Sequence, residues 1–219
     1  MKEIQIEEEL QLLSTRKIEK NAKDNALEHH EQKELVRRIK SLTNKKQIHK
    51  DKFLTLIYLM MESGMRVTEA IQCRLDWFNE TEDGVTITIP KQDKDVLNLR
   101  KQWIPKTNTS ARTVIFINEA VGQSVYGFFK ANPKGLQFTR QRAFQLIKEA
   151  GALINKEKLH PHALRSTYAN NLLYAGCDTN TLLYYMGWSS VTTFRNYVKS
   201  SENFARKDLL DKMRSSRTI

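Results

Sequence analysis

The sequence predicts a mainly α-helical fold that carries one small three-stranded antiparallel β-sheet. Most of the chain places apolar residues at helical spacing, and glycines or capping residues separate these stretches. In the middle of the chain, two short stretches instead alternate β-branched and polar residues with a period of two. With 219 residues and 40% hydrophobic content, the chain can build one good-sized core or two small ones without disulfides.

The helical stretches follow an N-terminal segment of different amino-acid composition. Residues 1–26 are rich in Glu, Lys, Gln and Asn, which suits a linker or an exposed helix, so we expect the globular domain to cover residues 27–219. The predicted helices cover residues 27–39, 51–63, about 67–75, 119–131, 139–155, 161–175, 179–186 and 190–198, with a last amphipathic segment at 202–213. The expected stops are Gly64, Gly176 and Gly187, and the expected N-caps are Thr139 and Ser189.

The predicted sheet lies between the third and fourth of these helices. Residues 84–90 alternate cleanly, and residues 111–117 do so less cleanly. Residues 102–105 are a candidate short strand between them. We expect the three stretches to pair as an antiparallel sheet.

Charge points to a polyanionic partner. The chain carries 36 Lys and Arg against 25 Asp and Glu, a net +11. Residues 1–26 hold five basic and six acidic residues, a net −1, which leaves +12 for residues 27–219. A basic protein need not bind nucleic acid, so the charge alone does not decide the function.

Other classes of protein fit the sequence poorly. The longest apolar run, residues 53–61, is far shorter than the roughly 20 residues of a membrane span, and the acidic N-terminus is unlike a secretory signal. Cys73 and Cys177 lie far apart and outside any metal-ligand spacing, so we expect two buried structural thiols, no metal and a cytoplasmic location.

One short motif combines a histidine and an arginine on a predicted helix. In Leu159-His-Pro-His-Ala-Leu-Arg-Ser-Thr-Tyr168, His162 and Arg165 stand three apart, so both side chains can reach one phosphate. Such a pair taken alone is more often a solvated helix face. Further along, the chain reads Leu182-Leu-Tyr-Tyr-Met-Gly-Trp-Ser-Ser-Val-Thr-Thr-Phe-Arg-Asn-Tyr197, with Tyr197 nine positions beyond Trp188.

Together with two earlier motifs, this arrangement resembles the tyrosine recombinase, or phage integrase, family. That family carries H-x-L-R, then a leucine-rich helix ending in G-H or G-W, then a tyrosine nine positions on. It also carries an earlier G-x-R-x-x-E signature, which Gly64-Met-Arg-Val-Thr-Glu69 matches, and a lysine on a β-hairpin, which Lys106 matches. The four motifs occur in family order within residues 27 to about 213. The sequence around Lys106 is most similar to that of archaeal integrases.

The resemblance implies the fold and the chemistry of a DNA breaking-rejoining catalytic domain. Tyr197 would attack the scissile phosphate and form a 3′-phosphotyrosyl intermediate, so rejoining needs neither ATP nor another cofactor. Arg66 and Arg165 would clamp the non-bridging oxygens, because a guanidinium presents a planar fork of donors and stays charged.

The remaining site residues would handle the proton or support the others. Lys106 is the candidate general acid for the leaving 5′ oxygen, His162 a donor or proton shuttle, and Trp188 an indole N–H donor. Glu69 and Ser166 would support these catalytic groups without contacting the phosphate themselves. Two positions depart from the commoner pattern of the family, which has His where this chain has Trp188 and His where it has Ser166.

DNA binding and assembly follow from the same resemblance. Thr139, Arg140 and Arg142 open a helix whose N-terminus could approach DNA, although a solvated helix start is equally plausible. The partners implied are double-stranded DNA at a specific recombination site, a tetramer of the chain on that DNA, and accessory DNA-bending proteins. Residues 202–213 would dock on a neighbouring protomer, with packing on the chain's own body as the alternative.

Two other functions fit the same motifs. A type IB topoisomerase-like enzyme uses similar chemistry to relax DNA without strand exchange. A DNA-binding regulator would have lost catalysis, although all six expected catalytic positions are filled here. Residues 1–26 are too short for the separate helical domain that usually precedes this catalytic domain, so we expect either a fragment of a longer integrase or a minimal member.

Overall fold

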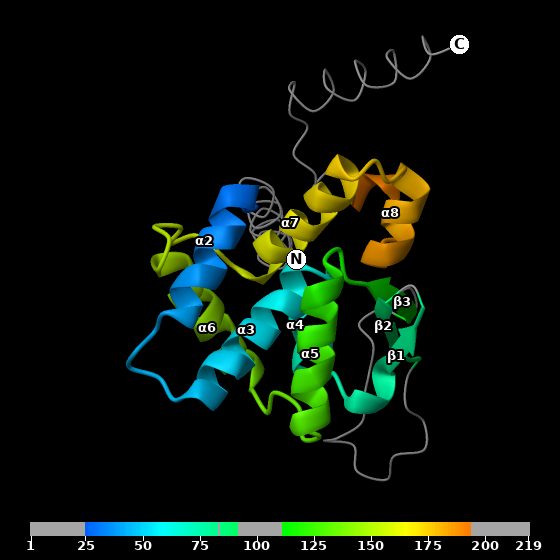
Figure 1. Cartoon of the computed structure of the whole chain (residues 1–219). Helices are drawn as coiled ribbons and strands as arrows, with labels where there is room; N and C mark the ends of the chain where they lie inside the picture. Colours follow the sequence, from blue (N-terminus) through cyan, green and yellow to red (C-terminus); the bar gives the residue numbers. More distant parts are fainter. Residues whose placement is uncertain (1–24, 83, 92–110, 194–219) are drawn as a thin grey trace, which may run out of the picture.

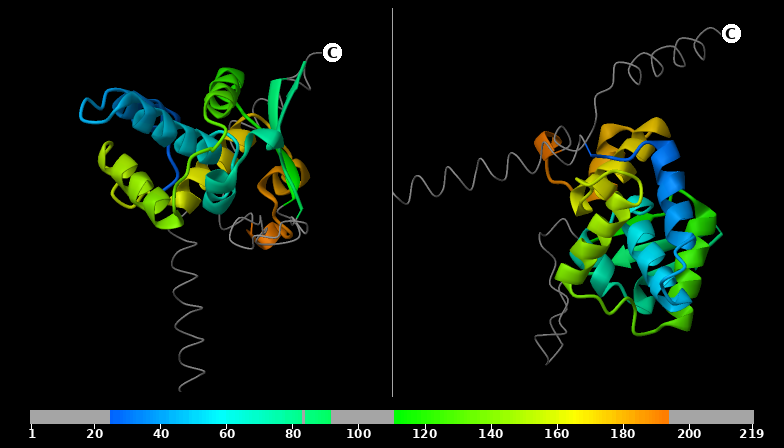
Figure 2. Two further views of the ribbon diagram at one scale, coloured as in Figure 1. Left: turned by 90° about the horizontal axis from the view of Figure 1, so that it is seen from below. Right: turned by 90° about the vertical axis from the view of Figure 1, so that its left-hand side faces the viewer.

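The computed structural model describes residues 25–82, 84–91 and 111–193. The domain is mainly helical, and its one small sheet lies at the side opposite α2 and α6 (Figures 1 and 2). The elements are α2 (His29–Lys40), α3 (Gln47–Met61), α4 (Val67–Gln72), a 3-10 turn (Leu75–Trp77), β1 (Phe78–Thr81), β2 (Gly84–Ile89), β3 (Arg112–Ile115), α5 (Glu119–Ala131), α6 (Arg140–Ala152), α7 (Pro161–Tyr174) and α8 (Thr179–Met186).

The sheet is three-stranded and antiparallel, as predicted, but one of its strands was not foreseen. Its order is β1-β2-β3, and Ile87 of β2 pairs with Phe78 on one side and Val114 on the other. The strand β1 escaped prediction because only Phe78 of its four residues is buried, so it shows no alternation. The candidate strand at 102–105 lies outside the described residues.

The helix α7 forms the centre of the core. Every residue from 163 to 170 is buried, and the helix packs closely against α3, whose residues 53–61 are all buried as well. One hydrophobic cluster includes Leu164, and the other begins at Tyr168 of the same helix. The helix that carries the histidine–arginine motif is therefore a structural centre and not a solvated face.

Most helix boundaries agree with the local signals. Thr139 caps α6, because its Oγ1 accepts from the N–H of Arg142 at 3.1 Å. Gly187 ends α8 in the left-handed conformation, at φ 60° and ψ 44°. The next helical residues are 191–193, so Ser190 precedes them and the predicted cap at Ser189 is wrong by one position.

Gly64 is required by space as well as by conformation. Its φ of +65° is in the left-handed region, and a Cβ at this position would collide with the ring of Tyr168. The Tyr168 hydroxyl in turn donates to the carbonyl of Ile115 at 3.1 Å, which ties α7 to the end of β3. The loop before Arg66 is thus fixed against α7.

The remaining structural expectations can be compared directly. Cys73 is buried, whereas Cys177 is only partly buried, so the expectation of two buried thiols is half right. Ala26 is 4% exposed and the N–H of Leu27 donates to Thr167 Oγ1 at 2.8 Å, so the described chain is already packed at its first residues. Within the described ranges, no helix is long and apolar enough to cross a membrane.

Candidate active site

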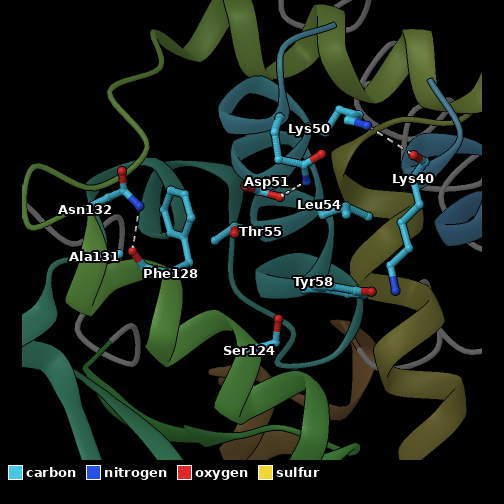
Figure 3. Close-up of a pocket in the computed structure, with 11 residues that line it drawn as sticks. Lys40, Lys50, Asp51, Leu54, Thr55, Tyr58, Ser124, Phe128, Ala131 and Asn132 are labelled. Carbon is cyan, nitrogen blue, oxygen red and sulfur yellow. Dashed lines mark hydrogen bonds between the residues drawn. The ribbon is translucent and has the colours of Figure 1, made fainter. Parts of the chain in front are cut away.

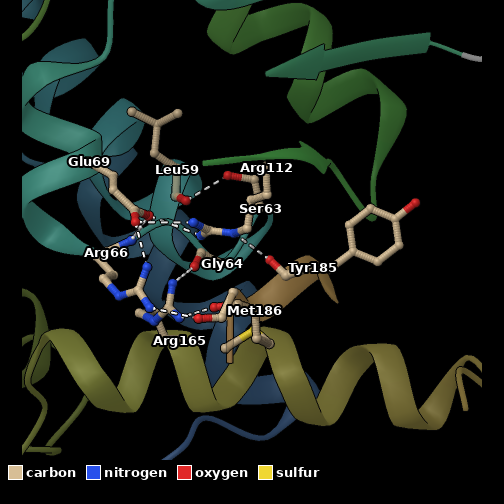
Figure 4. Close-up of polar contacts among 10 residues, drawn as sticks. Leu59, Ser63, Gly64, Arg66, Glu69, Arg112, Arg165, Tyr185 and Met186 are labelled. Atoms are coloured by element: carbon tan, nitrogen blue, oxygen red, sulfur yellow. Dashed lines mark hydrogen bonds and ion pairs between the residues drawn. The ribbon is translucent and has the colours of Figure 1, made fainter. Parts of the chain in front are cut away.

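Three arginines from separate elements converge on the C-terminal end of α8. The last carbonyls of a helix have no partner within it and carry the negative end of the helix dipole, so cationic donors are favoured there. Here three successive carbonyls each accept from a different arginine (Figure 4). The pairs are Arg112 Nε with Tyr185 O at 2.8 Å, Arg165 Nη2 with Met186 O at 2.8 Å, and Arg66 Nη2 with Gly187 O at 3.0 Å.

Arg66 is placed by the start of α4. It occupies the N-cap position with extended backbone, at φ −69° and ψ 154°. Glu69, three residues on, accepts from the Arg66 backbone N–H at 2.7 Å and from Arg66 Nη1 at 2.7 Å. The arginine-to-glutamate spacing of the sequence motif is thus the spacing of a helix start, with the carboxylate turned back onto the arginine.

Glu69 joins two of the arginines. Its two oxygens also accept from Arg112, with Nη1 to Oε1 at 3.1 Å and Nη2 to Oε2 at 3.0 Å, and both side chains are 1% exposed. Burial alone would raise the pKa of Glu69, but Arg112, Arg165 and Arg66 together lower it to about 2. A buried carboxylate that is ionised at neutral pH therefore lies between Arg66 and Arg112 (Figure 4).

Arg165 lies deeper than its motif suggested. The side chain rises from α7, and its Nη1 donates to the carbonyl of Gly64. Arg165 is only 2% exposed, whereas the Arg66 side chain is 16% exposed and His162, one turn earlier on α7, is partly exposed. The structure therefore brings both predicted arginines to one place, with Arg66 nearer the surface.

Trp188 follows the arginine cluster directly. The backbone N–H of Trp188 donates to Leu183 O at 2.9 Å, and the backbone N–H of Gly187 donates to Tyr184 O at 3.0 Å; these are the paired bonds of a glycine-ended helix. The residue is 8% exposed and belongs to the hydrophobic cluster that contains Tyr168. The turn that holds Trp188 is thus the same turn whose carbonyls bind the arginines.

Two of the six predicted catalytic residues are not placed. Lys106 and Tyr197 lie outside the described residues, as do residues 202–219. Ser166 is fully buried on α7, and its Oγ has no hydrogen-bond partner among the described residues. Its predicted supporting role therefore has no contact that would explain it.

Arg112 is the residue that sequence reasoning missed. The sequence placed it only within the predicted strand at 111–117, yet it makes three hydrogen bonds in this cluster, two to Glu69 and one to Tyr185 O. A signal was available, because Arg112, Val114 and Phe116 alternate on the buried side of β3 and its extension. A charged residue at an inward position of a strand requires a buried partner of opposite charge.

The predicted DNA-contacting residues lie at the start of α6. Thr139 and Arg140 are exposed, and the guanidinium of Arg140 lies 5.5 Å from the ring centroid of Phe144. Arg142 forms an ion pair with Glu149 at 2.9 Å, with about two fifths of each side chain exposed. Part of the positive charge expected for this helix is therefore already neutralised.

A pocket of about 450 Å³ lies elsewhere, between α3 and α5 (Figure 3). Lys40, Lys50, Asp51 and Tyr58 are among its lining residues, and none of the predicted site residues is. The pocket and the arginine cluster are therefore separate parts of the described structure.

Comparison with known proteins gives the chain its family. A family model described as "Phage integrase family" matches residues 25–203. The tyrosine recombinase XerD of Staphylococcus haemolyticus is 29% identical over 154 residues, which cover 70% of this chain and 52% of the relative. The chain thus spans about half the length of the curated relatives it matches.

Solved structures agree with this assignment. The crystal structure of XerA recombinase has a TM-score of 0.64 at 17% identity, over 85% of this chain and 64% of that one. The XerH site-specific recombinase, bound to a palindromic difH substrate in a post-cleavage complex, has a TM-score of 0.65 at 17% identity, over 84% and 52%. The predicted fold, a mainly helical recombinase domain with a small antiparallel sheet, is confirmed. With a family model that matches most of its length, this chain belongs to the phage integrase family of tyrosine recombinases.

Proposed function

We propose that the chain is the catalytic part of a site-specific DNA recombinase, which cleaves and rejoins DNA through a 3′-phosphotyrosyl intermediate. The observation that carries the proposal is the convergence of Arg66 and Arg165 on adjacent carbonyls at the end of α8. That turn leads directly to Trp188 and, nine positions later in the sequence, to Tyr197. Transfer of a phosphoryl group to a tyrosine requires positive charge at the phosphate, and these two arginines can supply it.

The two arginines serve the charged transition state. The scissile phosphate carries negative charge on its non-bridging oxygens, and this charge must be neutralised as the fifth bond to phosphorus forms. Guanidiniums suit this task because they stay charged and present paired donors. Glu69 offsets part of the positive charge, so the unliganded site can hold several arginines together.

The other predicted residues complete the reaction. The Tyr197 oxygen attacks phosphorus, the bond from phosphorus to the 5′ oxygen breaks, and the leaving oxygen takes a proton from Lys106. His162 and Trp188 donate hydrogen bonds to the phosphate or pass a proton. Rejoining is the reverse, in which a 5′-hydroxyl displaces the tyrosine, so the energy of the phosphodiester is conserved without a cofactor.

The partners follow from charge and family. Residues 27–219 carry a net +12, obtained from the +11 of the chain and the −1 of residues 1–26, which suits contact with DNA phosphates. Thr139, Arg140 and Arg142 are proposed contacts of α6. The proposed assembly is a tetramer on a specific duplex site in the cytoplasm, with accessory DNA-bending proteins and with residues 202–213 docked on a neighbour.

A covalent-capture experiment tests the proposal. The chain is incubated with a pool of randomised duplexes that carry a nick near the scissile position, so that the leaving strand diffuses away and the adduct accumulates. Denaturing gels should show a protein–DNA adduct that is absent in Tyr197→Phe and present in Tyr174→Phe, a control at an exposed tyrosine. Binding without any adduct would refute the proposal and favour a regulator, and cleavage without exchange between two duplexes would favour a relaxing enzyme.

A further inference from the structure

Arg112 is too well bound and too deeply buried to be a surface charge. Its guanidinium makes a bidentate pair with Glu69 and also donates to the carbonyl of Tyr185, with 1% of the side chain exposed. It therefore connects three elements: its own strand β3, the start of α4 through Glu69, and the end of α8 (Figure 4).

Stability alone is a weak reason to keep such a residue. Removing a guanidinium and a carboxylate from water is expensive, and well-packed apolar residues of similar volume often stabilise a protein equally well. An apolar residue cannot fix the orientation of its neighbours. The planar guanidinium of an arginine can, because it binds both oxygens of its carboxylate partner at once. The buried pair is thus better suited to orienting groups than to holding the fold together.

The groups that Arg112 orients are those that bind Arg66. Glu69 Oε1 accepts from both Arg112 Nη1, at 3.1 Å, and Arg66 Nη1, at 2.7 Å. The α8 turn likewise accepts from Arg112 at Tyr185 and from Arg66 two residues later, at Gly187. Each of these acceptors of Arg66 is therefore connected to Arg112, either directly or through one turn of backbone.

We propose that Arg112 is a positioning residue of the phosphate site, which holds Glu69 and the end of α8 so that the Arg66 guanidinium keeps one orientation. The inference rests on the proposed recombinase function, because it assigns to Arg66 the neutralisation of charge on the scissile phosphate. A misplacement of about 1 Å by a residue remote from the chemistry can cost about 10²-fold in rate. We therefore expect a loss of about that size in the cleavage step.

The first test needs no DNA. Arginine side-chain N–H signals are recorded by NMR on the full chain labelled with 15N-arginine, and the Arg66 signals are assigned through Arg66→Lys. In Arg112→Met they should move towards those of a solvent-exposed arginine, whereas Arg37→Met, which breaks an exposed pair with Glu34, should leave them in place. Unchanged Arg66 signals in folded Arg112→Met would overturn the proposal.

The second test measures adduct formation on the nicked duplex recovered from the randomised pool, with three forms of the scissile phosphate. On the natural phosphate, Arg112→Met should react about 10²-fold more slowly and Arg112→Lys should recover part of the rate. A methylphosphonate lacks the charge that Arg66 neutralises, so the defects of Arg112→Met and Arg66→Ala should both shrink. A 5′-phosphorothiolate needs no proton on its leaving group, so it should rescue Lys106→Ala and not Arg112→Met.

The outcomes separate the inference from the proposed function. A wild-type rate in Arg112→Met, or a defect cured by the phosphorothiolate, would overturn the positioning of Arg66 while the recombinase proposal stands. No adduct from the wild-type chain would remove the recombinase proposal, and the NMR test would still decide whether Arg112 orients Arg66. If Arg112→Met unfolds, Arg112→Lys takes its place in both tests, because it keeps the buried positive charge and Glu69 but loses the planar fork of donors.

Discussion

Replacing Glu69 by glutamine should destabilise the protein in a way that depends on pH. The lowering of its pKa from an ordinary 4.5 to about 2 corresponds to about 3 kcal/mol in favour of the ionised form, because one pKa unit is worth about 1.4 kcal/mol. The exposed fraction is 1%, so little of this is lost to solvent screening. Removing one partner of a buried pair costs about 3–5 kcal/mol, which agrees in size.

The direction of the pH dependence follows from the sign of the change. Because the folded-state pKa lies below 4.5, the carboxylate contributes fully above about pH 4.5 and loses its contribution as the pH falls through about 2. Glu69→Gln should therefore be about 3 kcal/mol less stable than the wild type at pH 7, and the difference should shrink to less than half by about pH 3.

Urea unfolding followed by circular dichroism measures this difference at each pH. Glu34→Gln is the matched control, because Glu34 also pairs with arginines and has its pKa lowered to about 2, but lies at the exposed surface of α2. Its substitution should change the free energy of unfolding little. A Glu69→Gln variant as stable as the wild type at pH 7, or a deficit that stays constant with pH, would show that the carboxylate is not what holds the arginines.

Three further substitutions test other parts of the structure. Gly64→Ala should lower the free energy of unfolding by about 2–5 kcal/mol in urea titrations, because it combines left-handed strain with a collision against Tyr168; a loss under 1 kcal/mol would mean that the loop adapts. Glu62→Gln should raise the melting temperature at pH 8.5 and leave it nearly unchanged at pH 4.5, since burial raises the Glu62 pKa to about 7 and ionisation above that pH opposes folding; equal effects at both pH values would refute this. Ser166→Ala should be neutral or stabilising by up to about 1 kcal/mol, because no partner of the hydroxyl is found in the described part of the chain, and a clear loss of stability would reveal one.

The sequence predicted those elements whose signals are local. Residues 119–131 and 179–186 are helices with the predicted bounds, because an asparagine or aspartate side chain caps each start and Gly187 ends the second. The strand β1 has no such signal, since a single buried residue creates no period.

The site was predictable only in part, for a similar reason. Arg66, Arg165 and Trp188 belong to short motifs whose spacing is visible in one chain, and the structure brings all three to the end of α8. Arg112 pairs with Glu69, 43 positions away, and no local pattern records such a pairing. The roles of Lys106 and Tyr197 stay predictions that the covalent-capture experiment tests.

The position of α7 between the two hydrophobic clusters limits how this protein can diversify. Substitutions on this helix affect folding and the Arg165 guanidinium together, because residues 163–170 are all buried. Laboratory evolution towards new target sequences should therefore accumulate few changes on α7. We expect retargeting to use exposed positions such as Thr139 and Arg140 at the start of α6, which are proposed DNA contacts and where a substitution carries little penalty in folding.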